Sequence, residues 1–141
     1  MESNFDKYVM GQTMGKFHAT SVHLWVEHLL ALSIRRVIPN PEPLFGERNI
    51  SFSLLVALCE AHRVIDLPLA EALRKLNSVR NKCAHQLMFN PSEQDWAVLS
   101  AAIDRVAPPP ERGEDVGSLR RLAEFVEQKA TALGAINPSQ T

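Results

Sequence analysis

The residues that could do chemistry lie in one stretch, from Leu69 to Leu87. At helical spacing an apolar stripe runs along it, made by Leu69, Leu73, Leu76, Arg80, Cys83 and Leu87. Arg80 interrupts this stripe with a charge that is costly to bury unless a partner or the solvent reaches it. Five positions later stands His85, the side chain best suited to transferring a proton near neutral pH. The pattern predicts a functional site. The structural alternative is an arginine that extends to the surface and a histidine that only ends a helix.

The ten residues from Leu76 to His85, LNSVRNKCAH, resemble the signature of the HEPN domains, which are small all-α proteins. That signature consists of an arginine, a polar residue, a few further positions and a histidine. Here Arg80, Asn81 and His85 fill it, and Ala84 before the histidine also fits. The wider resemblance covers about residues 17–106, although only the motif is specific.

For active members, the resemblance implies metal-independent RNA cleavage, in which the ribose 2′-hydroxyl attacks the adjacent phosphate and leaves a cyclic phosphate end. The catalytic residues would then be Arg80, Asn81 and His85. His85 would transfer the proton, and Arg80 would hold the phosphate and stabilise the charge of the transition state. Asn81 would orient the histidine or bind a phosphate oxygen. No metal and no cofactor is expected.

The resemblance also implies a homodimer whose paired motifs form one composite cleft. A toxin or defence effector is one role that it admits, with an antitoxin or inhibitor protein as a partner. In toxins of this family that are paired with a nucleotidyltransferase, a tyrosine two residues after the histidine accepts the modification. That position is Leu87 here, so this mechanism is not predicted.

Spacing limits how a single chain could build such a site. Positions five apart on a straight helix point roughly 140° away from each other, whereas positions four apart share a face. Arg80 and His85 therefore meet only if the helix ends or bends between Lys82 and His85, or if two copies of the chain come together. Both conditions can hold at once.

Local charge adds candidates for phosphate binding. Between Arg63 and Asn90 five basic residues stand against two acidic ones. Of these, Arg74, Lys75 and Lys82 are predicted to bind RNA beside the motif. The alternative is a solvated helix face, because a run of charges alone carries little information.

Composition indicates an ordinary globular protein of one domain. The chain has 141 residues, of which 45% are hydrophobic and 22% charged, and its net charge of −1 gives no overall attraction to RNA or to an anionic membrane. No apolar run approaches the ~18 residues of a membrane span, and the N-terminus lacks the layout of a secretory signal. We therefore expect a cytoplasmic protein without a membrane partner. Cys59 and Cys83 are expected to be reduced core residues.

The apolar periodicity predicts an all-α protein, a four- to five-helix up-and-down bundle of HEPN-like layout that forms one domain over 1–141. We expect a loose segment over 1–14, a four-helix core over 15–107 and a C-terminal helix over 116–134. The core helices are expected at about 14–37, at 51–64, after a cap at Asp66, and after a cap at Asn90. Leu44 and Phe45, in the surface loop expected from Pro39 to Asn49, are expected to reach back to the core.

The other histidines and the tryptophans are given structural roles. The first predicted helix carries three histidines at intervals of five, His18, His23 and His28, and these spiral around it without converging. His23 and Glu27 share a face, but two ligands do not make a zinc site. Trp25 and Trp96 fall on apolar faces and are expected in the core.

Three hypotheses remain open from the sequence. The first is a dimeric ribonuclease with Arg80 and His85 in its site. The second is a non-catalytic regulator or RNA-binding protein on the same scaffold. The third is a helical dimerisation module in which the Arg80 region is only structural.

Overall fold

The computed structural model describes residues 14–46, 50–85, 92–113, 115 and 117–137. All regular secondary structure in these ranges is helical. They are α2 (Met14–Val37), α3 (Glu42–Phe45), α4 (Phe52–Ala61), α5 (Leu67–His85), α6 (Glu93–Asp104) and α7 (Ser118–Ala132). The predicted all-α bundle is therefore confirmed. The predicted loose segment over 1–14 lies outside the described residues except for Met14.

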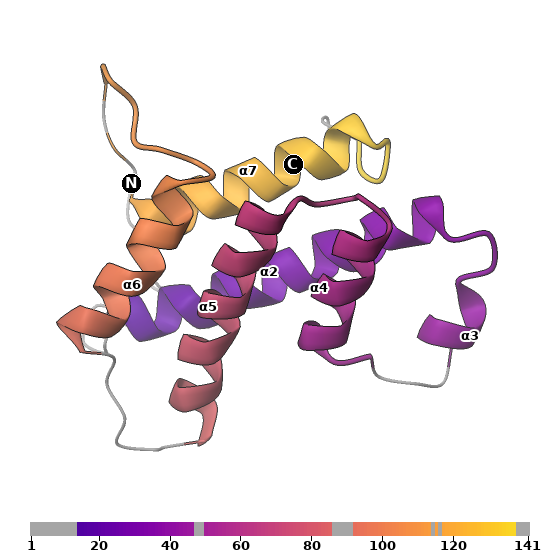
Figure 1. Cartoon of the computed structure of the whole chain (residues 1–141), viewed down its shortest axis with the longest axis horizontal. Coiled ribbons are helices and arrows are strands. Elements are labelled where there is room, and N and C mark those ends of the chain that lie inside the picture. The colour runs from indigo at the N-terminus through magenta and orange to yellow at the C-terminus, as the bar shows by residue number, and fades with distance from the viewer. Residues whose placement is uncertain (1–13, 47–49, 86–91, 114, 116, 138–141) are drawn as a thin grey trace, which may run out of the picture.

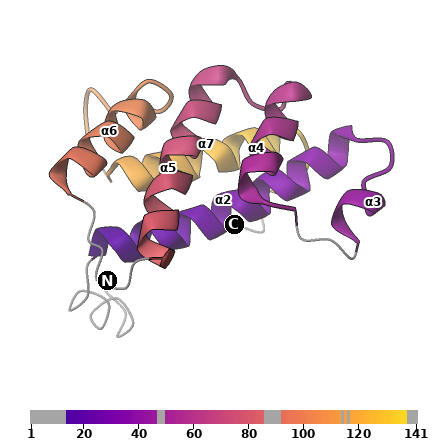
Figure 2. The ribbon, with the colours of Figure 1, turned by 60° about the horizontal axis from the view of Figure 1, so that its bottom comes forward.

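The helices are arranged around the long helix α2. Figures 1 and 2 show α7 beside α2, running in the same direction, while α4 and α5 form an antiparallel hairpin that crosses α2 steeply. Helix α6 packs on α5 and α7, and α3 lies at the opposite end of α2 (Figure 1). Helices α2, α4 and α5 touch one another pairwise, so their facing sides can build a shared site.

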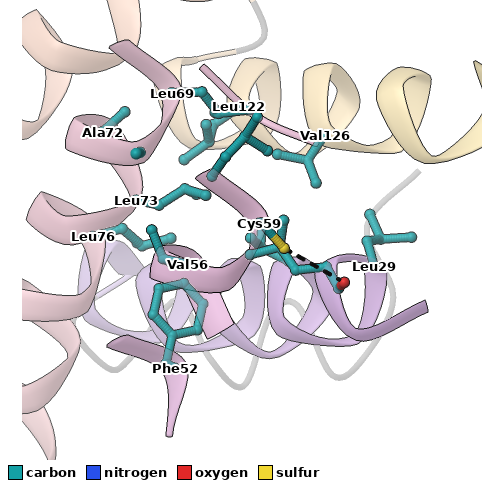
Figure 3. Close-up of a cluster of buried hydrophobic side chains, with 14 of the residues drawn as sticks. Leu29, Phe52, Val56, Cys59, Leu69, Ala72, Leu73, Leu76, Leu122 and Val126 are labelled. Atoms are coloured by element: carbon teal, nitrogen blue, oxygen red, sulfur yellow. Dashed lines mark hydrogen bonds between the residues drawn. The ribbon is translucent and has the colours of Figure 1, made fainter. Parts of the chain in front are cut away.

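One apolar core joins these elements. Leu29 of α2, Leu69 and Leu73 of α5 and Leu122 of α7 are almost wholly buried in it, together with Val56 of α4 (Figure 3). Each of these side chains contributes roughly 1.5–3 kcal/mol by leaving water, so the crossing of the hairpin over α2 and α7 is fixed mainly by hydrophobic burial. Cys59 and Cys83 are buried in the core, as expected, and they form no disulfide with each other.

Capping side chains set where the helices begin. Asp66 caps α5 as predicted, because its Oδ1 accepts a hydrogen bond from the Leu69 backbone N–H at 3.1 Å. The predicted cap of α6 is wrong: Ser92 holds that place instead of Asn90. The Ser92 hydroxyl accepts from the Asp95 N–H at 3.1 Å, and Asp95 Oδ2 accepts from the Ser92 N–H at 2.9 Å. This reciprocal capping box satisfies two backbone donors, which outweighs the Asn-Pro signal two residues earlier.

The apolar faces agree with the prediction at most positions but not at Trp25. Phe45 and Trp96 pack against the core, whereas the Trp25 side chain is 38% exposed and its ring lies 5.8 Å from that of His28. Trp25 thus covers the outer face of α2, and its predicted place in the core is wrong. None of the described helices has the length and the apolar character that crossing a bilayer requires.

Candidate functional site

The middle of α5 borders a surface cavity of about 580 Å³. Its walls come from α2, from Phe45 at the end of α3, from the start of α4 and from α5. Arg80 is half-buried and lines this cavity, while its neighbours in the stripe, Leu76 and Cys83, are buried. The charged residue that interrupts the apolar stripe therefore faces an opening in the protein.

Five polar side chains of α2 and α5 line this cavity, and we call them the polar cluster: His23 and Glu27 of α2, and Asn77, Arg80 and Asn81 of α5. The three residues of α5 share a face because they lie three and four positions apart. Arg80 Nη1 donates a hydrogen bond to Asn81 Oδ1 at 3.3 Å, and His23 Nε2 lies 3.0 Å from Asn77 Oδ1. The two helices are thus joined through polar groups in a region where the rest of their contact is apolar.

His23 is the buried member of the cluster, with an exposed fraction of 1%. Its ring packs on that of Phe52, with centroids 4.0 Å apart and planes tilted by 31°. Burial lowers the pKa of His23 below its ordinary value, and Arg80 lowers it further, while the hydrogen bond with Asn77 and the charge of Glu27 act in the opposite direction. The ring is therefore neutral at pH 7.

A neutral His23 has one arrangement that fits these contacts. Because the Asn77 Oδ1 atom only accepts, the Nε2 atom of His23 carries the hydrogen and donates it. The Nδ1 atom then holds the free lone pair, and it is buried without a hydrogen-bond partner among the described groups. His23 acts here as a fixed donor that orients Asn77.

His85, the predicted partner of Arg80, stands at the last position of α5. The helix continues without interruption to this residue, so it does not end between Lys82 and His85 as one of the two alternatives requires. The side chain of His85 lies outside the described part of the structure. On one straight helix the two positions face roughly 140° apart, so a bend in the helix or the meeting of two copies would be needed to unite them.

Within one chain, the histidine beside Arg80 is His23. Sequence reasoning does not pair these residues, although a signal for His23 is present. On α2, His23 falls in phase with Ala19, Val26 and Leu30, which are all buried. It interrupts an apolar stripe in the same way as Arg80 does. These two interruptions, one on each helix, both line the cavity.

The predicted RNA-binding residues Arg74, Lys75 and Lys82 are exposed on α5, and none of them is among the residues that line the cavity. Arg74 Nη2 donates to Glu60 Oε1 at 2.8 Å, and Lys82 Nζ lies 3.6 Å from Asp95 Oδ1. The structure therefore does not bring these three side chains together with Arg80.

Asp95 is held mainly by its own helix start. Its pKa is lowered chiefly because the Ser92 backbone N–H donates to it, and Lys82 adds to this effect. The contact between Lys82 and Asp95 thus links α5 to the start of α6, which gives Lys82 a structural role in the folded chain.

Two other kinds of chemistry find no support among the described residues. Three or more potential ligands do not come together anywhere in this part of the chain in a way that could hold a metal ion. Burial raises the pKa of Cys59 to about 12, and its Sγ atom donates to the Leu30 carbonyl oxygen at 3.8 Å (Figure 3). Because the thiolate is the reactive form, this cysteine is not a nucleophile in the folded protein.

Comparison of the chain with models of protein families, with curated proteins and with solved structures gives no match. The motif and the cavity are therefore the features of the chain that bear on its function.

Proposed function

We propose that this protein is a metal-independent endoribonuclease of the HEPN type, which cleaves RNA as a homodimer with a composite site. The observation that carries the proposal is the state of Arg80. This guanidinium is half-buried in an apolar stripe, lines a cavity, and forms no ion pair among the described residues. An arginine in such a place is suited to an anionic ligand, and its planar fork matches a phosphate.

The proposed reaction uses the nucleophile that RNA itself provides. The ribose 2′-oxygen forms a bond to the adjacent phosphorus, and the bond from phosphorus to the 5′-oxygen of the next nucleotide breaks. One base removes the proton of the 2′-hydroxyl, and one acid protonates the leaving 5′-oxygen. The products are a 2′,3′-cyclic phosphate and a 5′-hydroxyl, with no water consumed in this step.

The two proton transfers explain why the proposal includes a dimer. Each chain supplies one His85, so two copies supply a base and an acid. Arg80 would neutralise the additional charge on the phosphorus oxygens, and Asn81, which already accepts a hydrogen bond from Arg80, would keep that side chain oriented. His23 is unsuited to proton transfer, because it is buried and its Nε2–H is committed to Asn77.

The decisive experiment measures cleavage of mixed RNA by the purified protein in EDTA, with the chemistry of the product ends determined. We expect cleavage that resists chelation, yields cyclic phosphates, and falls at least about 100-fold in both Arg80→Ala and His85→Ala. Matched controls are His62→Ala and Arg112→Ala, since both residues are exposed and distant in sequence from the motif. Cleavage that persists in the two motif variants, or that requires a divalent metal, overturns the proposal.

A second candidate is a non-catalytic RNA-binding or regulatory protein. It is favoured by one observation, that a single chain pairs Arg80 with a neutral, buried histidine that cannot exchange a proton with a ligand. RNA binding without cleavage, lost in Arg80→Ala, would support this function. If RNA is not bound and Arg80→Ala produces monomers, the protein is a helical dimerisation module.

A further inference from the structure

The cavity beside Arg80 has a chemically mixed lining. The polar cluster contributes part of it, and Ser51 and Ser53 add two hydroxyl groups. Four apolar residues also line it, and we call them the apolar wall: Ala31 of α2, Phe45 of α3, and Ile50 and Phe52 at the start of α4. The volume of about 580 Å³ lies within the roughly 300–1,000 Å³ that small-molecule sites occupy. Its occupant should therefore carry a polar group and a flat or compact apolar group on the same molecule.

The polar cluster offers mainly hydrogen-bond donors. The amide oxygen of Asn77 accepts from His23, and the amide oxygen of Asn81 accepts from Arg80. Each amide keeps the two N–H groups of its NH₂, and one lone pair of its oxygen, for other partners. Together with the guanidinium of Arg80, which forms no ion pair among the described residues, these amide groups make a donor set that suits the oxygens of a phosphate.

The carboxylate of Glu27 limits how much negative charge a ligand in this cavity can carry. It is half-buried, lines the cavity, and forms no ion pair among the described residues. The charges of Glu27 and Arg80 both reach His23, with opposite effects, so the two groups lie in one electrostatic neighbourhood. One cation and one anion favour a ligand of single negative charge, such as a phosphodiester, over a doubly charged terminal phosphate.

The apolar wall is held in shape before any ligand arrives. Phe52 is buried and packs against the ring of His23. Phe45 packs against the core. The guanidinium of Arg35 lies 4.5 Å from the centroid of the Phe45 ring, and this guanidinium also forms an ion pair with Glu42 at 3.6 Å. Aromatic side chains fixed in this way form a surface on which a base can stack without a large cost in conformational entropy.

We infer that this cavity binds one nucleotide unit of an RNA strand, with the phosphodiester at Arg80, Asn77 and Asn81 and the base against Phe45 and Ile50. The inference rests on the proposed function for the choice of RNA, and adds to it a base-binding subsite within each chain. Because stacking accepts every base, the subsite selects an unpaired nucleotide more than a particular sequence. The cavity therefore directs the protein to single-stranded RNA.

The test is a calorimetric titration with a dinucleotide whose 2′-hydroxyl is methylated, so that binding is measured without cleavage. We expect one dinucleotide to bind per chain, and to bind at least about tenfold more tightly than inorganic phosphate, which lacks the base. Phe45→Leu, which keeps an apolar side chain but removes the flat ring, should weaken binding by about tenfold. Arg80→Lys, which keeps the charge but removes the fork, should weaken it by a similar factor.

Leu54→Ala is the matched control, because Leu54 is exposed on the same α4 and does not line the cavity. Glu27→Gln should reduce the preference for the dinucleotide over a nucleoside 3′-monophosphate. Equal affinity for phosphate and the dinucleotide, or binding that is unchanged in both Phe45→Leu and Arg80→Lys, overturns the inference.

The outcomes separate this inference from the proposed function. Dinucleotide binding that depends on Phe45, in a protein that cleaves no RNA, sustains the subsite and refutes the ribonuclease. RNA cleavage that is indifferent to Phe45→Leu, combined with no dinucleotide binding, sustains the ribonuclease and refutes the subsite.

Discussion

Arg121 and Arg80 both lie where helices pack together, and they differ in how completely they are paired. Arg121, whose side chain is 11% exposed, donates to Asp104 Oδ1 at 2.9 Å, to Asp115 Oδ1 at 3.1 Å and to the Ala107 carbonyl oxygen at 2.6 Å. Among the described residues, Arg80 donates only to a neutral amide, Asn81, at 3.3 Å. Arg121 ties the end of α6 and the following segment to α7. Arg80 remains available to a ligand, so a buried guanidinium is informative about function only once its partners are known.

The largest effect is expected at Arg80, and it tests whether this arginine serves RNA cleavage more than the stability of the fold. Arg80→Ala should lower the rate of RNA cleavage at least about 100-fold, because the charge that stabilises the transition state is removed. The free energy of unfolding should change by less than about 1 kcal/mol, since no ion pair of the described chain is lost. Single-turnover cleavage and urea denaturation measure the two quantities. A variant that unfolds readily but cleaves RNA normally when folded would assign Arg80 to stability.

Arg121→Ala should show the opposite behaviour. Removing it leaves two carboxylates and one carbonyl without their shared donor, and we expect a loss of about 2 kcal/mol in the free energy of unfolding. The partners Asp104 and Asp115 are about half exposed, which keeps the loss below that of a fully buried network. Cleavage by the folded fraction should equal that of the unmodified protein. Arg120→Ala is the control, because its ion pair with Glu124 is exposed.

His23 should make stability depend on pH in the acidic range. Its pKa is lowered from 6.5 in the folded chain, chiefly by burial, so below about pH 6.5 the unfolded chain binds a proton that the folded chain does not. The free energy of unfolding should then fall with decreasing pH, by at most about 1.4 kcal/mol per pH unit, until the pH reaches the folded pKa.

Urea denaturation between pH 8 and pH 5 measures this slope. His23→Gln should remove that part of it, whereas His62→Gln, at the exposed end of α4, should retain it. If the unmodified protein, His23→Gln and His62→Gln all show the same slope, protonation of His23 does not lower the free energy of unfolding.

The smallest effect is expected at Arg74. Its ion pair with Glu60 is exposed, so Arg74→Ala should change the free energy of unfolding by less than about 0.5 kcal/mol. RNA affinity should fall only slightly, because Arg74 does not line the cavity. A large loss of RNA affinity, measured by fluorescence anisotropy at fixed salt, would restore Arg74 to the binding surface that the sequence predicts.

Local patterns were sufficient for much of the fold. The helix over 14–37 has the predicted bounds, because prolines at 39, 41 and 43 prevent its continuation. The cap at Asp66 followed from residue type and position alone. Trp25 shows the limit of periodicity, since a tryptophan at the edge of a broad apolar face can cover either the core or the outer surface, and the neighbouring helices decide which.

The candidate site was predicted only in part. Arg80 could be found because one helix suffices to reveal a charge in an apolar stripe. Its surroundings could not be found, because His23 and Asn77 are 54 positions apart and meet only through the packing of α2 against α5. His85 remains a prediction, because its place beside Arg80 depends on a second copy of the chain.

Cys59 gives this protein an internal reporter. An alkylating reagent needs a thiolate that it can reach, and this sulfur is enclosed by the core and almost wholly protonated at pH 8. Cys59 should therefore be modified only while the core is transiently open. The rate of its labelling then measures how often the native molecule opens, without any added dye or denaturant.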